Sequence, residues 1–382
     1  MITNIKEEVL KCSRCGNCQY YCPSFTAVRK ETHVARGRLQ LIGRNLDQPG
    51  DYSDSFMRRL DQCLLCGNCS QNCPAGVSVE EIVEAMRGAR VERMGPGQAL
   101  ASVAGNIAKE GNITGDGRGN RLLWLENMAA DAVKIGKPAE YVYFTGCVPS
   151  LYPSSYSIPQ TFSALLNKAG LDWTLLGEKE NCCSYPLVIG GMRGEAAEAF
   201  RENLRLVEEL GAKAVVTTCP SCYHLWKEVS HELIPDMPSI EVYHGTQLLA
   251  KLVREGAYRL KENDCTVVFH DSCDLGRKSG VYDEPRDILK AIPGVKLKEM
   301  KFNRESAFCC GGGGNLEMND SALSGLVAQQ RVAQALDAGA DVLVTACQQC
   351  KRTLSGGARK MRARIKILDI SEFLLNAAIA ER

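Results

Sequence analysis

Short apolar segments alternate with longer amphipathic segments over the last two thirds of the chain. Two of the amphipathic segments, Glu195–Leu210 and Ser321–Ala338, predict long helices, and Gly211 suits the left-handed end of the first. The apolar segments predict eight strands: Tyr141–Phe144, Trp173–Leu176, Ala214–Thr217, Ile240–Tyr243, Thr266–Phe269, Val295–Glu299, Val342–Thr345 and Ile365–Leu368. Strands that alternate with helices favour parallel, doubly wound α/β sheets.

The N-terminal quarter of the chain has a helical pattern instead. His33–Ile42 favours one helix, and apolar residues three and four apart from Val79 to Met94 favour another. We therefore predict an α+β multidomain protein with a helical domain over 1–95, a connector over 96–139, and α/β domains over 140–262 and 263–382. In the connector, Gly115–Gly119 follows no predicted strand, which favours a linker over a dinucleotide-binding loop.

The composition is that of a soluble globular protein of 382 residues, 45% hydrophobic and 24% charged. With 46 Lys and Arg against 45 Asp and Glu, its net charge of +1 argues against a nucleic-acid-binding protein. No apolar run reaches the roughly 18 residues that span a bilayer, and the N-terminus lacks the apolar core of a signal peptide. We expect a cytoplasmic protein without a membrane segment of its own, attached at most peripherally to the inner face of the membrane through a partner.

The chain has 19 cysteines, an odd number for which a disulfide framework is a poor explanation. Eight of them form two copies of Cys-x2-Cys-x2-Cys-x3-Cys-Pro, a pattern in which three thiolates share one cubane [4Fe–4S] cluster and the fourth binds its neighbour. The spacing predicts one cubane held by Cys12, Cys15, Cys18 and Cys73, and another held by Cys63, Cys66, Cys69 and Cys22. A zinc site would leave the third and fourth cysteines of each copy unused.

Ten further cysteines form a second repeat, offset by 126 to 128 residues. Its two sets are Cys147, Cys182, Cys183, Cys219 and Cys222, and Cys273, Cys309, Cys310, Cys347 and Cys350. Leu210–Cys219 also lines up with Ala338–Cys347, which indicates an internal duplication. Cys265 is left over, and its apolar surroundings predict a buried strand thiol.

The cysteines of both sets follow predicted strands, at the edge where parallel sheets hold ligands. Five thiols exceed the needs of one cubane, which favours a larger or more open iron–sulfur cluster in each set. A thioredoxin-like dithiol at Cys219–Cys222 and a zinc site are alternatives. Neither Cys-x2-Cys pair precedes a histidine, which excludes covalent c-type haem, and no flavin or nicotinamide fingerprint is present.

Two five-cysteine sets behind a two-cluster ferredoxin pattern resemble the CCG-domain family, which includes the heterodisulfide reductases. His270–Arg277, Gly280–Arg286 and Phe308–Gly314 also match, and the resemblance covers nearly the whole chain. The likeness is to their D-type polypeptide, in which B-type and C-type parts are fused. It implies a helical two-cluster ferredoxin domain, a non-cubane [4Fe–4S] cluster in each five-cysteine set, and cleavage of a small disulfide between them. It also implies a partner that donates electrons, such as a flavoprotein, a ferredoxin-type protein or a b-type cytochrome. Ser184 stands where the family usually has glycine.

Two other functions stay open at this point. The iron–sulfur subunits of glycolate or lactate oxidases and of anaerobic glycerol-3-phosphate dehydrogenase also resemble this chain. In such an assembly, or in a larger bifurcating or low-potential reductase, this chain would carry electrons without a substrate of its own. A metal-binding scaffold or redox sensor is the third hypothesis. Two complete five-cysteine sets favour disulfide reduction.

Several residues outside the cysteine sets are candidates for catalysis or binding. His270 is the candidate proton donor to a departing thiolate, ahead of His224 and His244, and for each of them a structural or supporting role is favoured, more strongly for the last two. The cations that suit an anionic substrate are Lys278, Arg277 and Arg286, of which Arg286 also suits pinning of its loop.

Two further segments have predicted local roles. Arg36 and Arg38 suit steering of an acidic partner, but a solvated helix face is favoured for them. Gly311–Gly314 is not followed by the Lys and Ser/Thr of a phosphate-binding loop, and it favours close approach of backbone N–H groups to cluster sulfur.

Overall fold

The computed structural model describes residues 4–47, 52–126, 128–129 and 132–379. Its N-terminal part is built of helices: α1 (Ile5–Leu10), α2 (Cys18–Tyr21), α3 (Pro23–Val28), α4 (Ala35–Asp47), α5 (Asp54–Asp61), α6 (Asn68–Gln71) and α7 (Val79–Met94). Each cysteine motif sets the local chain path. Cys22 is extended and Pro23 opens α3, a position where the missing proline N–H costs nothing.

Two four-stranded parallel sheets follow. The first has the order β2-β1-β3-β4, with β1 Tyr141–Tyr143, β2 Trp173–Thr174, β3 Ala214–Thr217 and β4 Glu241–His244. The second has the order β7-β6-β8-β9, with β6 Cys265–His270, β7 Val295–Lys298, β8 Val342–Thr345 and β9 Lys366–Asp369. All eight predicted strands are present within two residues of their predicted ends, and the predicted α+β multidomain fold is confirmed.

The helices around the two sheets repeat as well. They are α9 (Cys147–Leu151), α10 (Ser157–Lys168), α11 (Tyr185–Val188), α12 (Arg193–Glu209), α13 (Pro220–His224), α14 (Ser230–Leu233), α15 (Gly245–Arg254), α16 (Asp283–Ala291), α17 (Leu316–Asn319), α18 (Ser321–Asp337), α19 (Gln348–Met361) and α20 (Ile370–Ala377). In the duplication α10 corresponds to α16, and α15 to α20. α10 packs on α20, and α16 packs on α15. The two contacts are therefore equivalent under the duplication, as in a pseudo-two-fold arrangement of the halves.

A short antiparallel pair, β5 (Arg259–Leu260) with β10 (Ala378–Ile379), was not predicted from the sequence. It joins the end of the first half to the end of the second. Strands of two residues are too short to leave a periodic pattern in the sequence, so this pairing is evident only from the structure.

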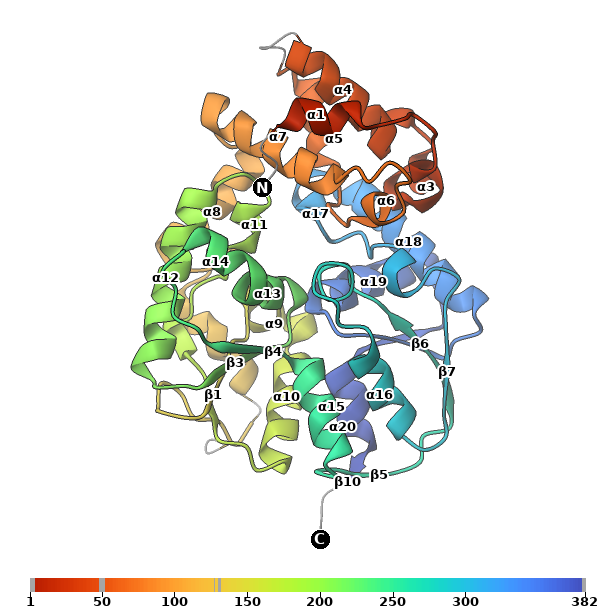
Figure 1. The fold of residues 1–382 in the computed structure, drawn as a ribbon. Helices are drawn as coiled ribbons and strands as arrows, with labels where there is room; N and C mark the ends of the chain where they lie inside the picture. Colours follow the sequence, from red (N-terminus) through yellow and green to blue (C-terminus); the bar gives the residue numbers. More distant parts are fainter. Residues whose placement is uncertain (1–3, 48–51, 127, 130–131, 380–382) are drawn as a thin grey trace.

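The ferredoxin part lies across the tops of both halves (Figure 1). The buried guanidinium of Arg87 on α7 joins all three parts, because it donates to Ile189 O of the first half, Gly314 O of the second, and Leu60 O and Cys63 O of the ferredoxin part. No helix in the described ranges has both the length and the apolar character that crossing a bilayer requires.

Two sequence predictions need correction. Arg38 is 2% exposed rather than solvated, because its guanidinium donates to the carbonyls of His33, Arg59 and Gln62. Cys265 lies on a strand as predicted but is only partly buried.

The connector has secondary structure of its own. It contains α8 (Gln98–Glu110) and a 3₁₀ segment, Arg118–Leu125, that takes up the end of the glycine-rich stretch. The boundaries assigned to the four regions stay a prediction.

Candidate functional site

The first ferredoxin motif and the end of the second line one cavity. Its cysteines are those of the first predicted cubane, Cys12, Cys15, Cys18 and Cys73, together with Cys69. The thiols differ in environment. The backbone N–H of Asn17 lowers the pKa of the exposed Cys15, whereas burial raises that of Cys18.

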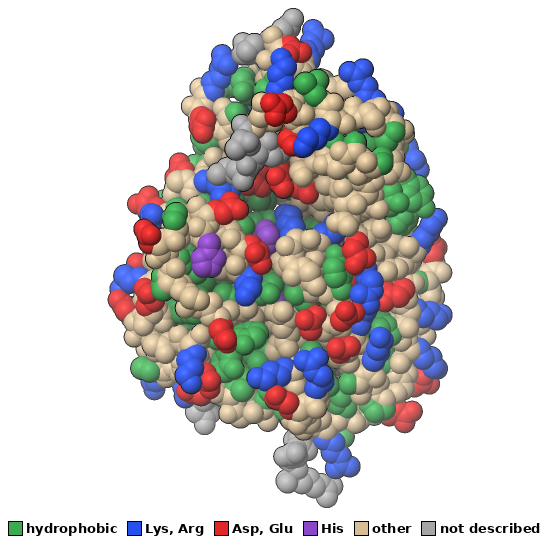
Figure 2. Space-filling model, viewed as in Figure 1, with side chains coloured by type: hydrophobic (Ala, Val, Ile, Leu, Met, Phe, Trp, Pro, Cys, Tyr) green, Lys and Arg blue, Asp and Glu red, His purple; other side chains and the backbone are tan. Residues whose placement is uncertain are grey.

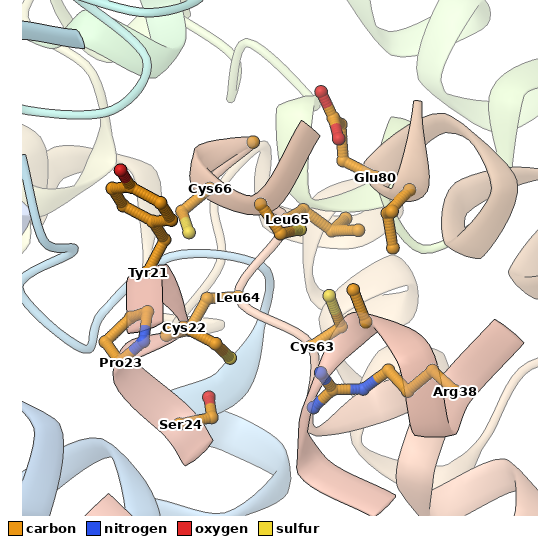
Figure 3. Close-up of a pocket in the computed structure, with 14 residues that line it drawn as sticks. Tyr21, Cys22, Pro23, Ser24, Arg38, Cys63, Leu64, Leu65, Cys66 and Glu80 are labelled. Atoms are coloured by element: carbon orange, nitrogen blue, oxygen red, sulfur yellow. The ribbon is translucent and has the colours of Figure 1, made fainter. Parts of the chain in front are cut away.

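A second cavity contains the thiols of the second predicted cubane. Cys22, Cys63, Cys66 and Cys69 line it, and Figure 3 shows the labelled cysteines and Arg38 around it. Burial raises the pKa of Cys22 and of Cys66 to about 11, so that thiolates here require positive charge close by. The structure thus groups Cys22 with the second motif and brings Cys73 to the first.

In the first α/β half, the five thiols form one chain of contacts. Cys147 contacts Cys182, Cys182 contacts Cys183, and Cys183 contacts Cys222, which also contacts Cys219. The second half repeats this order with Cys273, Cys309, Cys310, Cys350 and Cys347. The duplication therefore preserves the arrangement of the sulfur atoms as well as the spacing in sequence.

The middle thiol of each chain differs from its neighbours. Hydrogen bonds from Cys182 and Cys222 lower the pKa of Cys183 to about 6, and bonds from Cys309 and Cys350 do the same for Cys310. The second cysteine of each doublet is therefore the one that two other thiols approach.

Backbone N–H groups stabilise the sulfurs. Ser184 N donates to Cys182 Sγ, Gly312 N to Cys310 Sγ, and Cys350 N to Cys347 Sγ, each at 3.3 Å. The Gly312 contact agrees with the role predicted for the glycine run. Cys347 is also the N-cap of α19, where free N–H groups favour a thiolate.

The residue after each doublet is left-handed. Ser184 has φ +69° and Gly311 has φ +97°. A Cβ on Gly311 would lie 2.4 Å from Ser324 O, so the second half requires glycine, whereas the first accommodates serine. The departure at Ser184 therefore leaves the chain path around the first doublet intact.

The connector supplies a charge to the first thiol set, which the sequence did not predict. Arg121 is 1% exposed, donates through Nη2 to Cys147 Sγ at 3.4 Å, and pairs with Glu180 at 3.0 Å. Glu180 in turn accepts from the backbone N–H groups of Thr145 and Gly146. Although burial lowers the pKa of Arg121, Cys147 and Glu180 raise it above its usual value.

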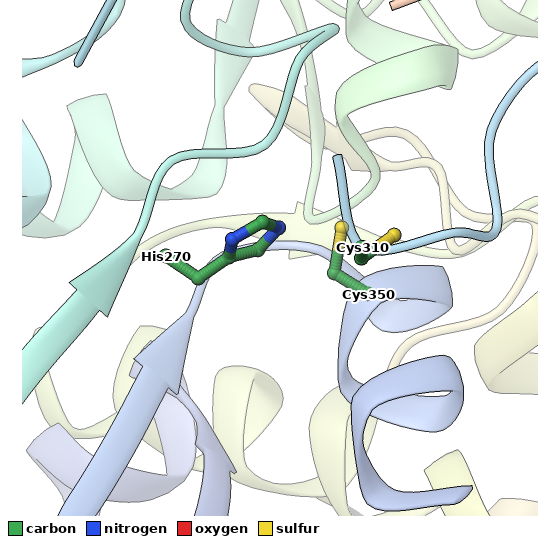
Figure 4. Close-up of side chains that lie close together, drawn as sticks. All are labelled: His270, Cys310 and Cys350. Carbon is green, nitrogen blue, oxygen red and sulfur yellow. The ribbon is translucent and has the colours of Figure 1, made fainter. Parts of the chain in front are cut away.

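The second thiol set has an imidazole instead. One ring nitrogen of His270 and the sulfurs of Cys310 and Cys350 lie within 4.8 Å of one another (Figure 4). His270 Nδ1 accepts from Arg331 Nε at 3.0 Å. Burial and this guanidinium hold the pKa of His270 well below its usual value, which keeps the ring neutral with its proton on Nε2.

The second ferredoxin motif packs directly on this set. A Cβ on Gly313 would lie 3.1 Å from Leu64 O and 3.5 Å from Cys309 Sγ, so the glycine allows the two cysteine sites to approach each other. Arg277 fixes the contact, since it donates to Cys66 O and Ala307 O. It also donates to Glu305 O, so these hydrogen bonds give Arg277 a structural role, and its predicted role in binding an anionic substrate stays a prediction.

A polar cluster joins the two thiol sets. Lys278 Nζ donates to Tyr185 Oη at 2.5 Å and pairs with Asp274 at 3.0 Å, and Ser221 Oγ donates to Asp274 at 2.6 Å. Tyr185 and Ser221 belong to the first half, next to its cysteines, whereas Asp274 follows Cys273 of the second. Although burial lowers the pKa of Lys278, Asp274 and Tyr185 raise it well above its usual value.

The cluster lies where α13 meets the loop that follows β6, and its members Tyr185 and Asp274 are buried. The Lys278 side chain is 19% exposed, which leaves it within reach of a ligand. Figure 2 shows this face hollowed below the ferredoxin part, with Lys or Arg and His side chains inside the hollow.

The other predicted candidates have different positions. His224 contacts Ser279 beside the polar cluster, and burial lowers its pKa to about 4. His244 is the N-cap of α15 and has a structural role. Arg286 is 1% exposed and pairs with Asp271 and Glu299, so it pins its loop rather than facing the hollow.

The thiols fit iron–sulfur clusters in number and chemistry. All 19 cysteines are free, and all but Cys265 gather in two cavities and two contact chains. Thiolate sulfur is the ligand that such clusters take, and four or more converge at each place.

Comparison with known proteins agrees with this picture. The cysteine-rich CCG domain matches residues 141–225 and 267–355, and the 4Fe-4S dicluster domain matches residues 8–77. The D-type polypeptide of the dihydromethanophenazine:CoB--CoM heterodisulfide reductase from Methanosarcina barkeri is 32% identical over 97% of this chain and 94% of that protein. The chain belongs to the D-type heterodisulfide reductase family. It is an iron–sulfur oxidoreductase subunit with a ferredoxin-like part and two CCG domains.

Two further similarities are broader. The EtfAB:quinone oxidoreductase of Syntrophomonas wolfei is 29% identical to this chain. The similarity covers 96% of this chain and 58% of that longer protein. A solved structure, a hypothetical protein from Helicobacter pylori, has a TM-score of 0.65 and 12% identity, covering 100% of this chain and 74% of that one. This second likeness shows a shared fold.

Proposed function

We propose that this chain is the disulfide-cleaving subunit of a heterodisulfide-reductase-like complex. The observation that supports it is the polar cluster of Lys278, Tyr185, Asp274 and Ser221, which joins the two α/β halves beside their five-thiol sets. A disulfide that enters there meets both sets at once. The reaction consumes two electrons and two protons and releases two thiols.

In this proposal the ten thiols hold two non-cubane [4Fe–4S] clusters, and the ferredoxin thiols hold two cubanes. Bound clusters supply electrons one at a time and stabilise sulfur as the S–S bond opens. Leu64 shares an apolar cluster with Cys273 and Cys309, so the cubane that Cys22, Cys63, Cys66 and Cys69 would hold, the inner cubane, would be the neighbour of the second thiol set. The cubane that Cys12, Cys15, Cys18 and Cys73 would hold, the outer cubane, would have the exposed Cys15 among its ligands.

The residues of the chain would bind and orient the disulfide. Lys278 stays protonated, so its ammonium attracts an anionic substituent or a developing thiolate. Asp274 holds that ammonium in place, and Ser221 and Tyr185 fix Asp274 and Lys278 across the two halves. His270, whose side chain contacts Arg331 and its own thiol set, fits positioning of the sulfurs better than proton delivery to the hollow.

The test uses the anaerobically purified chain with reduced methyl viologen and a mixed disulfide of two chemically distinct thiols. We expect release of both thiols and oxidation of two viologen radicals per disulfide. Viologen oxidation that stops once the clusters are reduced, without thiol release, would contradict disulfide cleavage. Lys278→Met, which keeps every cysteine, is the matched variant for loss of turnover with retained iron.

The second candidate is an electron-transfer subunit without its own substrate. The similarity to an EtfAB:quinone oxidoreductase over nearly the whole chain favours it. A flavoprotein partner would then reduce the ferredoxin part, and the same relay would end at an acceptor of the complex. Cluster reduction without thiol release supports this function.

A further inference from the structure

The two ferredoxin turns have one backbone conformation in two different surroundings. Arg14 in the first and Leu65 in the second are left-handed, with φ +58° and +47°. Gly16 and Gly67 follow with φ +85° and +71°. The turns therefore present equivalent edges of their predicted clusters, and only the side chains between the cysteines differ.

The inner turn is covered by the rest of the chain. Leu64 and Leu65 are 4% and 2% exposed, and Leu64 packs in one apolar cluster with Cys273 and Cys309. Asn68, directly after the turn, donates to Ser306 O of the second half. In the inner turn, apolar side chains between the cysteines thus lie at the edge that faces the second thiol set.

The equivalent edge of the outer turn is exposed. Ser13, Arg14 and Cys15 are all exposed, and Cys15 is the only cysteine of the described chain in that class. A groove runs beside this turn, and its lining includes Val9, Leu10, Cys12, Arg14, Leu39 and Arg44. Leu10 is 72% exposed, more than any other large apolar side chain among the described residues.

The charge on this surface is positive. Arg36 pairs with Glu31, and Asp47 pairs with Lys6. Arg14 and Arg44, both exposed, have no ion-pair partner among the described residues. These two cations lie in one groove with an apolar side chain, and one of them, Arg14, directly precedes the exposed Cys15. Such a surface complements an acidic one.

We infer that the surface formed by Leu10, Arg14, Cys15 and Arg44 is the docking site of a soluble electron-carrier protein with an acidic rim around its redox centre. One electron passes from the reduced carrier to the outer cubane, which leaves the carrier oxidised and the cubane reduced, with no bond made or broken. This inference goes beyond the proposed function, since it holds for disulfide cleavage and for electron transfer alike.

Binding without electron transfer tests the surface first. The probe is an oxidised, strongly acidic [2Fe–2S] ferredoxin, titrated calorimetrically into the oxidised chain at low and high salt. We expect Arg14→Glu/Arg44→Glu to weaken binding at least about tenfold at low salt and to flatten its salt dependence. Lys251→Glu/Lys290→Glu, at exposed positions on α15 and α16 at the opposite end (Figure 1), is the matched control and should bind like wild type.

Stopped-flow reduction by the same ferredoxin, measured against methyl viologen radical, provides the second readout. The double reversal should slow reduction by ferredoxin about tenfold or more and leave reduction by the viologen within twofold. Arg44→Glu alone, on α4 and outside the turn, should slow reduction by ferredoxin several-fold with the iron content intact. Unchanged ferredoxin binding in the double variant, or equal slowing with both reductants, would overturn the inference.

Discussion

Arg121 Nη2 lies 3.4 Å from Cys147 Sγ. Both groups are buried, and the two residues are 26 positions apart in the sequence. The same guanidinium neutralises Glu180, whose other oxygen accepts from the backbone and hydroxyl of Thr145. In the first thiol set a guanidinium thus donates directly to one sulfur, whereas in the second the neutral ring of His270 lies against the sulfurs of Cys310 and Cys350. The two sites of the duplication are alike in sulfur and differ in the side chain that contacts it.

Replacing Arg121 with methionine should lower the reduction potential of the cluster in the first set, because a nearby positive charge favours the reduced form. It also leaves Glu180 buried without its partner, which should cost about 3–5 kcal/mol of the free energy of unfolding. The measurements are an EPR-monitored redox titration and anaerobic denaturant unfolding.

Arg121→Met/Glu180→Gln is the control for this change. It removes both charges, so it should recover much of the lost stability and keep the lowered potential. A potential equal to that of wild type in both variants would show that Arg121 does not act on the cluster.

Lys278→Met should reduce kcat/KM for the disulfide by about 10²–10³, the range found when one preorganised charge is removed from a reacting group. Its iron content should stay that of wild type, because lysine is not a cluster ligand. Lys278→Arg keeps the charge opposite Asp274 and should retain more activity. Equal kcat/KM in Lys278→Met and wild type would remove the polar cluster from the mechanism.

A reciprocal exchange tests the turns after the two cysteine doublets. Gly311→Ser places a Cβ 2.4 Å from Ser324 O at φ +97°, so the second set should lose its cluster of about four irons. Ser184→Gly suits the same left-handed conformation and should keep all its iron. Iron and sulfide analysis of the two variants decides, and equal iron in both would contradict the packing constraint.

Asp369 gives the fold a pH dependence. Burial and Glu372 raise its pKa to about 7, and its Oδ2 has no partner among the described residues. Because the folded-state pKa lies above the ordinary value of 3.8, folding favours the protonated form, and stability should fall as pH rises from about 4 to 7. Each unit of difference corresponds to about 1.4 kcal/mol.

Asp369→Asn keeps an oxygen for the cap of α20 and should abolish this loss, so that unfolding at pH 5.5 and pH 8 requires more nearly equal denaturant. Asp337→Asn, at an exposed position on α18, is the control. A wild-type chain that is more stable at pH 8 than at pH 5.5 would contradict the assignment.

The sequence predicted the strands and the cysteine groups because both signals are local. A strand such as Val342–Thr345 is a short apolar run, and the spacing from Cys12 to Cys22 fixes a turn whatever surrounds it. The duplication then indicated two equivalent sites. These patterns are visible in the sequence without knowledge of long-range contacts, although such contacts bring the five thiols of each half together.

The burial of charged residues whose partners are distant in the sequence could not be predicted. Arg38 can be buried because three backbone carbonyls accept hydrogen bonds from it. Arg121 can be buried because it donates to Glu180 and to Cys147. Ser221 and Asp274 each adjoin a cysteine, the one signal that pointed to them, but their hydrogen bond exists only where the two halves meet. The spacing of residues along one chain gives no information about such pairs.

Iron and acid-labile sulfide per chain, measured on anaerobically prepared protein, test the central claim most directly. Four four-iron clusters predict about 16 Fe in wild type, and about 8 Fe once Cys182, Cys183, Cys309 and Cys310 are changed to serine. A wild-type chain with only about 8 Fe, whose ten α/β cysteines titrate as free thiols or hold zinc, would contradict the account.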